Sequence, residues 1–194
     1  MKVLDRFIIG DEADAEVILY GMKIIISHFI SVMVVLVCAL LLHSLDIAAI
    51  YLVTLLLLRR NVGGYHCKTY LGCLLTTTIA FMLIALTNIW FAQGVKEILG
   101  ISFLLYSVIK IVNIKPIINK NRIVNETTIE KSNKKKTKYV SILIIVSTIL
   151  HLLGRMGIIN GYDYFYAISS SMLVIALSIE IITIGDERYE RINE

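Results

Sequence analysis

Ile24 to Leu42 reads IIISHFISVMVVLVCALLL, nineteen residues that are apolar apart from two serines and His28. A helix of that length rises about 28 Å, close to the roughly 30 Å thickness of the hydrocarbon layer of a bilayer. The run therefore predicts a membrane-spanning helix. Within it, we expect His28 to be a packed or hydrogen-bonded side chain rather than a ligand.

The rest of the chain has the same apolar character. Of its 194 residues 57% are hydrophobic, the mean hydropathy is +0.79 and there is one proline. An average soluble domain of this composition would have too little polar surface. The three cysteines form no disulfide framework, since Cys38 lies deep in the first apolar run. We therefore predict an all-α, polytopic membrane protein.

Five more apolar runs follow, and together they predict six transmembrane helices in a single domain over residues 1–194. The second run is short, so it needs tilt or added length at its ends to cross a bilayer. Met1 to Glu16 mixes apolar and charged residues, a pattern typical of an amphipathic segment at the membrane interface. The five runs are Ile47 to Leu58, Tyr70 to Phe91, Ile98 to Ile114, Tyr139 to Leu153 and Tyr162 to Ile184.

Basic residues are distributed unevenly between the two predicted sides of the membrane. With both termini in the cytoplasm, two of the nineteen Lys and Arg residues, Lys96 and Arg155, fall outside, and the other seventeen fall inside. This agrees with the positive-inside rule. It predicts a basic cytoplasmic loop over residues 115–138. The aromatic residues within 162–166 would form a belt at the outer interface.

One stretch combines charge, glycines, an imidazole and thiols: Arg59 to Cys73 reads RRNVGGYHCKTYLGC. His66 and Cys73 are the residue types of a general base and a thiol nucleophile, and the two glycines before them permit a turn. On one straight helix the pair would be separated by about 10.5 Å along the axis, too far for an easy hydrogen bond. We therefore expect a helix that begins near Thr69, a plausible N-cap, with His66 folded back over Cys73.

Several alternatives remain open for this stretch. Arg59, Arg60 and Lys68, together with the positive end of the helix, would favour a thiolate at Cys73. Cys67 is the alternative nucleophile, ranked lower because adjacent side chains diverge and Cys67 is next to His66.

A zinc site of His66, Cys67 and Cys73 is a rival, although the spacing lacks the paired cysteines of structural zinc sites. A purely structural role in packing is another alternative. No third catalytic residue is preferred among the polar candidates, which are Asn61, Thr69 and Asn88.

The motif Arg-Arg-x-x-Gly-Gly-x-His, with a Cys seven residues after the His, resembles that of the accessory gene regulator protein B family, the membrane cysteine endopeptidases of Gram-positive quorum sensing. Lys115 to Arg122, with its Pro followed by Asn-Lys and Asn-Arg, resembles the second landmark of that family. Segment order and length agree over essentially the whole chain. The resemblance implies a multi-pass protein of the cell membrane, with both termini and the motif in the cytoplasm.

The resemblance also implies an activity. The family cleaves a small precursor peptide, of the accessory gene regulator D type, near its C-terminal tail. It forms an acyl-enzyme thioester, which a Cys or Ser of the same peptide attacks to close a thiolactone or lactone ring. Carried over, Cys73 is the nucleophile and His66 its base, with no metal or other cofactor.

Expected partners are the precursor peptide, membrane lipid and a second copy in a homodimer, with no nucleic acid. The basic residues are expected to recruit the acidic tail of the peptide. A small non-enzymatic transporter or membrane scaffold, whose basic residues only anchor to anionic lipid, is the competing class. The predicted peptide-binding residues are Arg59, Arg60, Gly63, Gly64, Lys134, Lys135 and Lys136.

Overall fold

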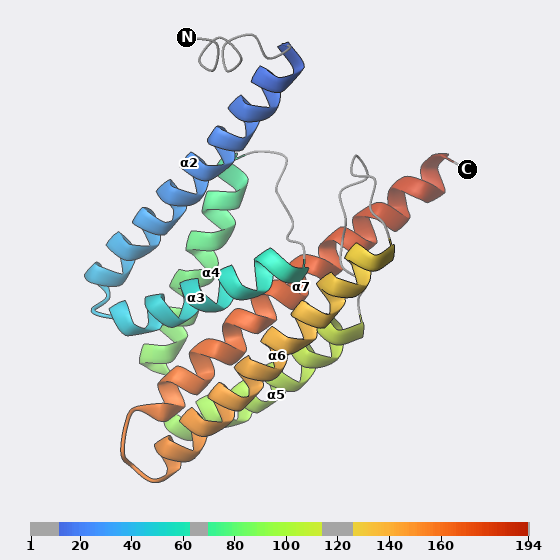
Figure 1. Ribbon diagram of the computed structural model, residues 1–194. Coiled ribbons are helices and arrows are strands. Elements are labelled where there is room, and N and C mark those ends of the chain that lie inside the picture. Colours follow the sequence, from blue (N-terminus) through green and yellow to red (C-terminus); the bar gives the residue numbers. More distant parts are fainter. Residues whose placement is uncertain (1–11, 63–69, 114–125, 194) are drawn as a thin grey trace, which may run out of the picture.

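A computed structural model describes residues 12–62, 70–113 and 126–193 of the chain (Figure 1). All regular structure in this part of the chain is helical, which confirms the all-α prediction. The described residues form six helices, as many as the apolar runs predicted. They are α2 (Glu12–Leu41), α3 (Leu45–Val62), α4 (Tyr70–Trp90), α5 (Gln93–Asn113), α6 (Glu126–Arg155) and α7 (Gly161–Asn193).

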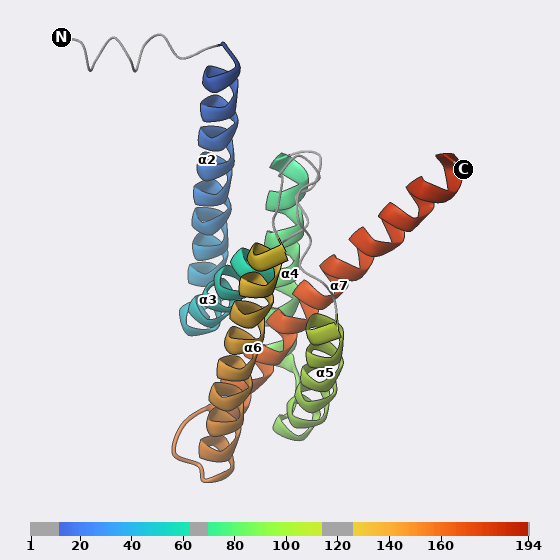
Figure 2. The same ribbon diagram turned by 45° about the vertical axis from the view of Figure 1, so that its right-hand side comes forward.

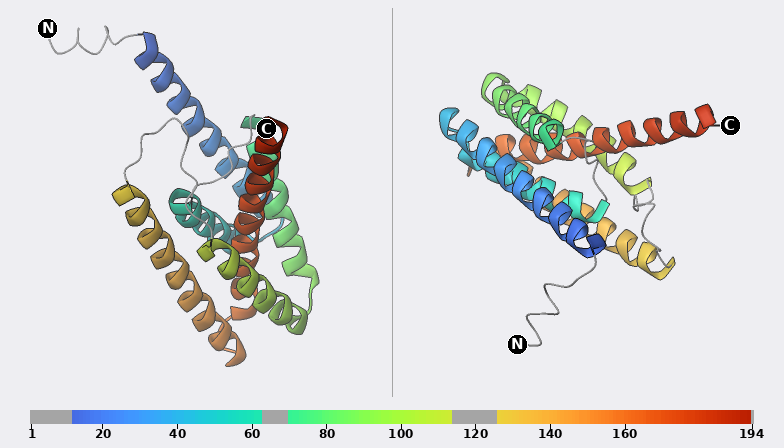
Figure 3. Two further views of the ribbon diagram at one scale, coloured as in Figure 1. Left: turned by 90° about the vertical axis from the view of Figure 1, so that its right-hand side faces the viewer. Right: turned by 90° about the horizontal axis from the view of Figure 1, so that it is seen from above.

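Helix α7 is the centre of the bundle, because it packs against α3, α4, α5 and α6 (Figure 2, Figure 3). Helix α2 lies to one side and packs against α3 and α4. Residues that α7 buries include small ones, such as Ala167, Ser169, Ser171 and Ala176. Small side chains let helices approach closely inside a membrane, where apolar burial alone does not bring helices together. The main apolar core draws on all six helices.

Three helices of the described chain are long and apolar enough to cross a membrane: Leu71–Trp90, Asn133–Arg155 and Gly161–Ile181. Ile25–Leu41 is a shorter apolar helix. The short second run lies in α3, which runs across the view of Figure 1 while α2 and α4 rise more steeply. Large apolar side chains line the outside of the bundle, as expected of a surface that contacts lipid.

The break between α6 and α7 falls where the sequence predicted it and depends on glycines. Gly157 has a φ of +71°, in the left-handed region that side chains with a Cβ rarely adopt. A Cβ on Gly161 would overlap the carbonyl oxygen of Leu150 and the backbone nitrogen of Gly154. The two helices therefore approach closely at this turn only because glycine occupies it.

Two polar contacts join α5 to α7. Near the start of both helices, Lys96 Nζ lies 2.6 Å from Asp163 Oδ1, and the Lys96 side chain is 8% exposed. Near the end of α5, Glu180 accepts hydrogen bonds from Tyr106 Oη at 2.6 Å and Lys110 Nζ at 2.5 Å. A charged side chain inside a helical bundle is costly unless it is paired. These pairs therefore fix α5 along the length of α7.

The structure corrects the predicted basic loop over residues 115–138. Helix α6 begins at Glu126, so the lysine run lies on a helix rather than in a loop. Lys134 pairs with Glu130 one turn earlier, at 2.7 Å. Such pairs and the good helix propensity of Lys and Glu support the extension. A run of charge ends the apolar part of a helix without ending the helix itself.

The predicted aromatic belt is also wrong for two of its residues. Phe165 is 2% exposed and Tyr166 is 3% exposed. The Tyr166 hydroxyl bonds to Thr87 Oγ1 at 3.1 Å, and the Phe165 ring lies 4.8 Å from the His151 ring. Because α7 is surrounded by other helices, aromatic side chains at its start point into the bundle instead of toward lipid.

At the amino-terminal side, α2 begins at Glu12. Residues 12–16 of the predicted interfacial segment are therefore continuous with the first apolar helix. The remainder of that segment, residues 1–11, lies outside the described residues.

Candidate active site

Cys73 lies in the first turn of α4, which begins at Tyr70. This start agrees with the prediction of a helix beginning near Thr69. The Cys73 residue is buried, with 8% of its surface exposed. Amide groups at a helix start carry a partial positive charge, and a thiolate near them is stabilised. The position therefore suits a nucleophilic thiol better than a position in the middle of a helix would.

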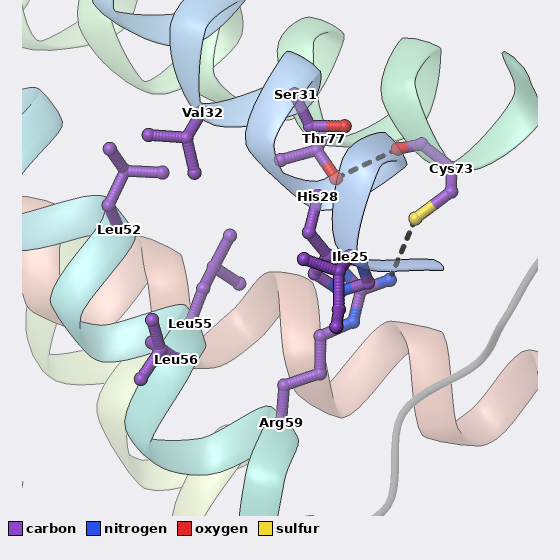
Figure 4. Close-up of a pocket in the computed structure, with 10 residues that line it drawn as sticks. All are labelled: Ile25, His28, Ser31, Val32, Leu52, Leu55, Leu56, Arg59, Cys73 and Thr77. Carbon is purple, nitrogen blue, oxygen red and sulfur yellow. Dashed lines mark hydrogen bonds between the residues drawn. The ribbon is translucent and has the colours of Figure 1, made fainter. Parts of the chain in front are cut away.

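Arg59 makes direct contact with the sulfur of Cys73. Its Nη2 donates a hydrogen bond to Cys73 Sγ at 3.3 Å (Figure 4). Arg59 comes from the last turns of α3, fourteen residues earlier in the chain. A guanidinium that donates to sulfur stabilises negative charge on that sulfur. The expected proximity of a basic residue to Cys73 is thus confirmed for Arg59.

A second contact between α3 and α4 lies one helical turn deeper. Thr77 Oγ1 donates to the Cys73 carbonyl oxygen at 2.8 Å, and Tyr51 Oη donates to the Thr77 carbonyl oxygen at 2.8 Å. Tyr51 is fully buried, and its ring lies 5.7 Å from that of Phe81. Tyr51 and Arg59 therefore connect α3 to α4 at two points, one at Cys73 and the other at Thr77, one turn further along α4.

Cys73 also borders a partly open cavity of about 450 Å³ lined by residues of α2, α3 and α4. Its walls are mostly apolar, and its polar groups are grouped near the sulfur (Figure 4). The size lies within the range of about 300–1,000 Å³ typical of ligand pockets. The lining residues are Ile25, His28, Ser31, Val32, Leu52, Leu55, Leu56, Arg59, Cys73 and Thr77.

His28 is a cavity residue that the sequence interpretation did not connect to the motif. It was expected to be packed or hydrogen-bonded within the first span. The structure brings it to the same cavity as Cys73 and Arg59, although it lies 45 residues before Cys73 in the chain. The sequence did contain a signal for a functional role of His28, because an ionisable residue within a membrane span is a candidate functional residue by default.

Several predicted site residues fall outside the part of the chain that the structure describes. His66, Gly63, Gly64 and Cys67 lie within 63–69, as does Thr69.

Other predicted residues lie in helices. Arg60 and Asn61 are in the last turn of α3. Asn88 is near the far end of α4, about 22 Å along the helix axis from Cys73, and its Nδ2 donates to the carbonyl oxygen of Asp163 at 3.2 Å. Asn88 is therefore too far from Cys73 to contact it.

The three lysines assigned to peptide binding differ in their surroundings. Lys134 and Lys135 are exposed. Lys136 is 2% exposed, and its Nζ donates to the carbonyl oxygen of Val112 at 3.1 Å. Val112 is in the last turn of α5, where carbonyl groups lack partners within the helix. Lys136 therefore caps α5 and is not part of an exposed basic surface, which corrects its grouping with the other two.

Within the described residues, no three His, Cys, Asp or Glu side chains are arranged to hold a metal ion. Two residues of the rival zinc set, His66 and Cys67, lie outside those residues. The described part of the site therefore has one thiol, Cys73, with a cationic neighbour and an apolar cavity beside it.

Comparison with curated proteins and with solved structures gave no match. A family model described as Accessory gene regulator B matches residues 3–184. The match covers the motif around Cys73, the second landmark at 115–122 and the six described helices up to residue 184. It supports a role in accessory gene regulator peptide processing at a membrane, with a link to a precursor peptide of the accessory gene regulator D type. The chain therefore belongs to the accessory gene regulator B family.

Proposed function

We propose that this chain is a membrane-embedded cysteine endopeptidase that removes the C-terminal tail of an accessory gene regulator D-type precursor peptide and promotes closure of the product into a ring. The observation that carries the proposal is the contact of Cys73 Sγ with Arg59 Nη2, at 3.3 Å, beside an apolar cavity. A cation at a thiol favours the nucleophilic form of that thiol. Structural thiols in apolar cores do not require such a neighbour.

His66 acts as the general base in this proposal. It takes the proton of the Cys73 thiol, and the sulfur attacks the scissile carbonyl carbon of the peptide. The carbon–nitrogen bond breaks, the proton passes from His66 to the leaving amine, and a thioester remains on Cys73. Backbone amides at Gly63 and Gly64 are candidates to stabilise the oxyanion that forms during the attack.

Ring closure follows from the chemistry of the thioester. A Cys thiol or Ser hydroxyl of the same peptide attacks the thioester carbonyl, the Cys73 sulfur leaves, and a thiolactone or lactone forms. An intramolecular nucleophile has a high effective concentration and so competes well with water. A site from which water is partly excluded increases that advantage.

Peptide binding involves the basic residues that the sequence predicted for it. Arg60, Lys134 and Lys135 attract the acidic tail, while Arg59 contacts the peptide close to the sulfur. Lys136 is buried against α5 and belongs to the support of the fold.

Substitution of the two catalytic residues tests the proposal. Cys73→Ala and His66→Ala should each abolish tail release while membrane insertion remains normal, because alanine keeps the span Leu71–Trp90 apolar and His66 lies outside the predicted apolar runs. Cys67→Ala is the matched control and should retain activity. An inactive Cys67 variant beside an active Cys73 variant would refute the assignment. Absence of tail release by the unaltered protein would favour the transporter or scaffold class, in which the thiols are dispensable, and loss of activity with a chelator would favour zinc.

The proposed location is the cell membrane of a Gram-positive bacterium, with several crossings, both termini in the cytoplasm, and contacts to lipid and to a second copy in a homodimer. The charge distribution supports this orientation. Cys67 should be shielded from an impermeant thiol reagent in intact cells and become labelled when the membrane is opened. Labelling from outside would reverse the orientation. Light scattering of the purified protein measures whether it is a dimer.

A further inference from the structure

We infer that the cavity between α2, α3 and α4 is a specificity pocket that takes a large apolar side chain of the peptide, on the acyl side of the scissile bond. The inference rests on the proposed function and adds the substrate preference. It is carried by three observations. Cys73 forms part of the cavity wall, the wall far from Cys73 is apolar, and the volume is large enough for an aromatic ring.

The cavity extends inward from Cys73. Arg59 and Cys73 lie where α3 ends and α4 begins, while Val32 and Leu52 lie close together at the other end of the group of lining residues (Figure 4). Polar atoms are available only near the sulfur, where Arg59 and Thr77 bond to Cys73. A group that enters therefore meets polar contacts at the reacting carbonyl and apolar contacts beyond it.

The volume discriminates between possible occupants. An apolar cavity of about 150 Å³ accepts a benzene molecule, so about 450 Å³ accommodates an aromatic or long aliphatic side chain together with adjoining backbone. An alanine side chain would leave most of this space unfilled and forfeit the apolar contacts. A charged side chain would lose its hydration without gaining a partner in the deeper part.

The acyl side is favoured over the leaving side for chemical reasons. Cleavage creates a new amino group on the leaving fragment, which is protonated near neutral pH and forms beside the sulfur, where the positive charge of Arg59 repels it. The acyl fragment instead remains attached to Cys73 as an uncharged thioester. A pocket that holds its side chain therefore contributes both to the attack on the scissile bond and to the retention of the intermediate until the ring closes.

The test uses synthetic precursor peptides with an internal cysteine and an acidic tail, which differ only in the residue on the acyl side: Ala, Leu or Phe. Tail release by the purified full-length protein is followed by mass spectrometry. We expect kcat/KM for Leu and Phe to exceed that for Ala by at least about tenfold. Val32→Phe, which narrows the cavity, should abolish that preference by lowering the rates for the Leu and Phe peptides toward the rate for the Ala peptide.

Val37→Phe is the matched control, because Val37 is on the same helix, does not line the cavity and is 55% exposed. It should leave the peptide preference unchanged. Equal rates for the three peptides, or an equal loss for all three in Val32→Phe, would overturn the inference and point to a lipid chain as the occupant.

A photoreactive phenylalanine at the acyl-side position gives a second measurement on the unaltered protein. It should crosslink to α2 or α3 residues of the cavity wall. Crosslinks to residues outside the cavity wall would refute the assignment of the cavity as the specificity pocket, even if the peptide is cleaved at the normal rate. Crosslinking to the wall without any tail release would contradict the proposed endopeptidase and leave the pocket in place.

Discussion

Replacing Arg59 by Met should slow the first chemical step without displacing the helices. The guanidinium donates to Cys73 Sγ at 3.3 Å, and the methionine side chain occupies similar space with neither charge nor donor. Hydrogen bonds that involve a charged group contribute roughly 1.5–3 kcal/mol. Sulfur is a diffuse acceptor and Arg59 is only half-buried, so the lower part of that range applies. A loss of about 1.5–2 kcal/mol corresponds to a ten- to thirtyfold slower reaction.

Two assays measure this effect in a chain that also carries Cys38→Ala and Cys67→Ala, so that Cys73 is the one thiol. Tail release from the precursor peptide reports the whole reaction, and alkylation of Cys73 reports the nucleophile alone. Both rates should fall by about tenfold or more near pH 7.

Arg155→Gln provides the control, because Arg155 is exposed and lies at the end of α6. It should alkylate and release the tail at the unaltered rate. If Arg59→Met alkylates normally at every pH but fails to release the tail, then Arg59 binds the peptide and does not stabilise the sulfur. If both rates are unchanged, the contact with Cys73 has no role in the reaction.

The remaining predictions concern support of the site and the basic residues. Tyr51→Phe removes the hydrogen bond to the Thr77 carbonyl group and should cost about 1 kcal/mol, measured as a lower midpoint of thermal unfolding in detergent; an unchanged midpoint would show that the contact does not stabilise the fold. The double variant Lys134→Gln with Lys135→Gln should weaken peptide affinity severalfold in neutral detergent, as raised salt does for the unaltered protein, because both charges are exposed. Unchanged affinity in both tests would leave these lysines as a membrane anchor. Lys136→Met should instead lower stability by about 1–2 kcal/mol with no salt-sensitive change in affinity, since it removes the cap on α5.

The helices themselves were predictable from the sequence. Apolar runs of the right length each specify one helix in a bilayer, and the start of α4 near Thr69 followed from the capping chemistry of Thr and from the geometry that His66 and Cys73 require. The buried thiol at a helix start with a basic neighbour was predictable for the same reason. These features depend on residues close together in the chain.

The features that were not predictable depend on how helices rotate against one another. Lys134, Lys135 and Lys136 are indistinguishable as a sequence, yet one lysine in the run turns toward the end of α5 and becomes buried. Phe165 and Tyr166 have the composition of an interfacial belt, but α7 is at the centre of the bundle. The cavity beside Cys73 likewise requires the relative placement of three helices, which no local pattern encodes.

The two contacts between α3 and α4 explain why the site needs this placement. Along α3, Tyr51 and Arg59 are about 12 Å apart, while their partners Thr77 and Cys73 are about 6 Å apart along α4. Because the two contacts are spaced differently on the two helices, together they fix both the crossing angle and the rotation of α3 relative to α4. Either contact alone would leave the crossing angle or the rotation unconstrained. Loss of the deeper contact should therefore also loosen the Arg59–Cys73 contact. The Tyr51→Phe variant, whose ring still packs on Phe81, should consequently lower tail release, but by less than Arg59→Met does.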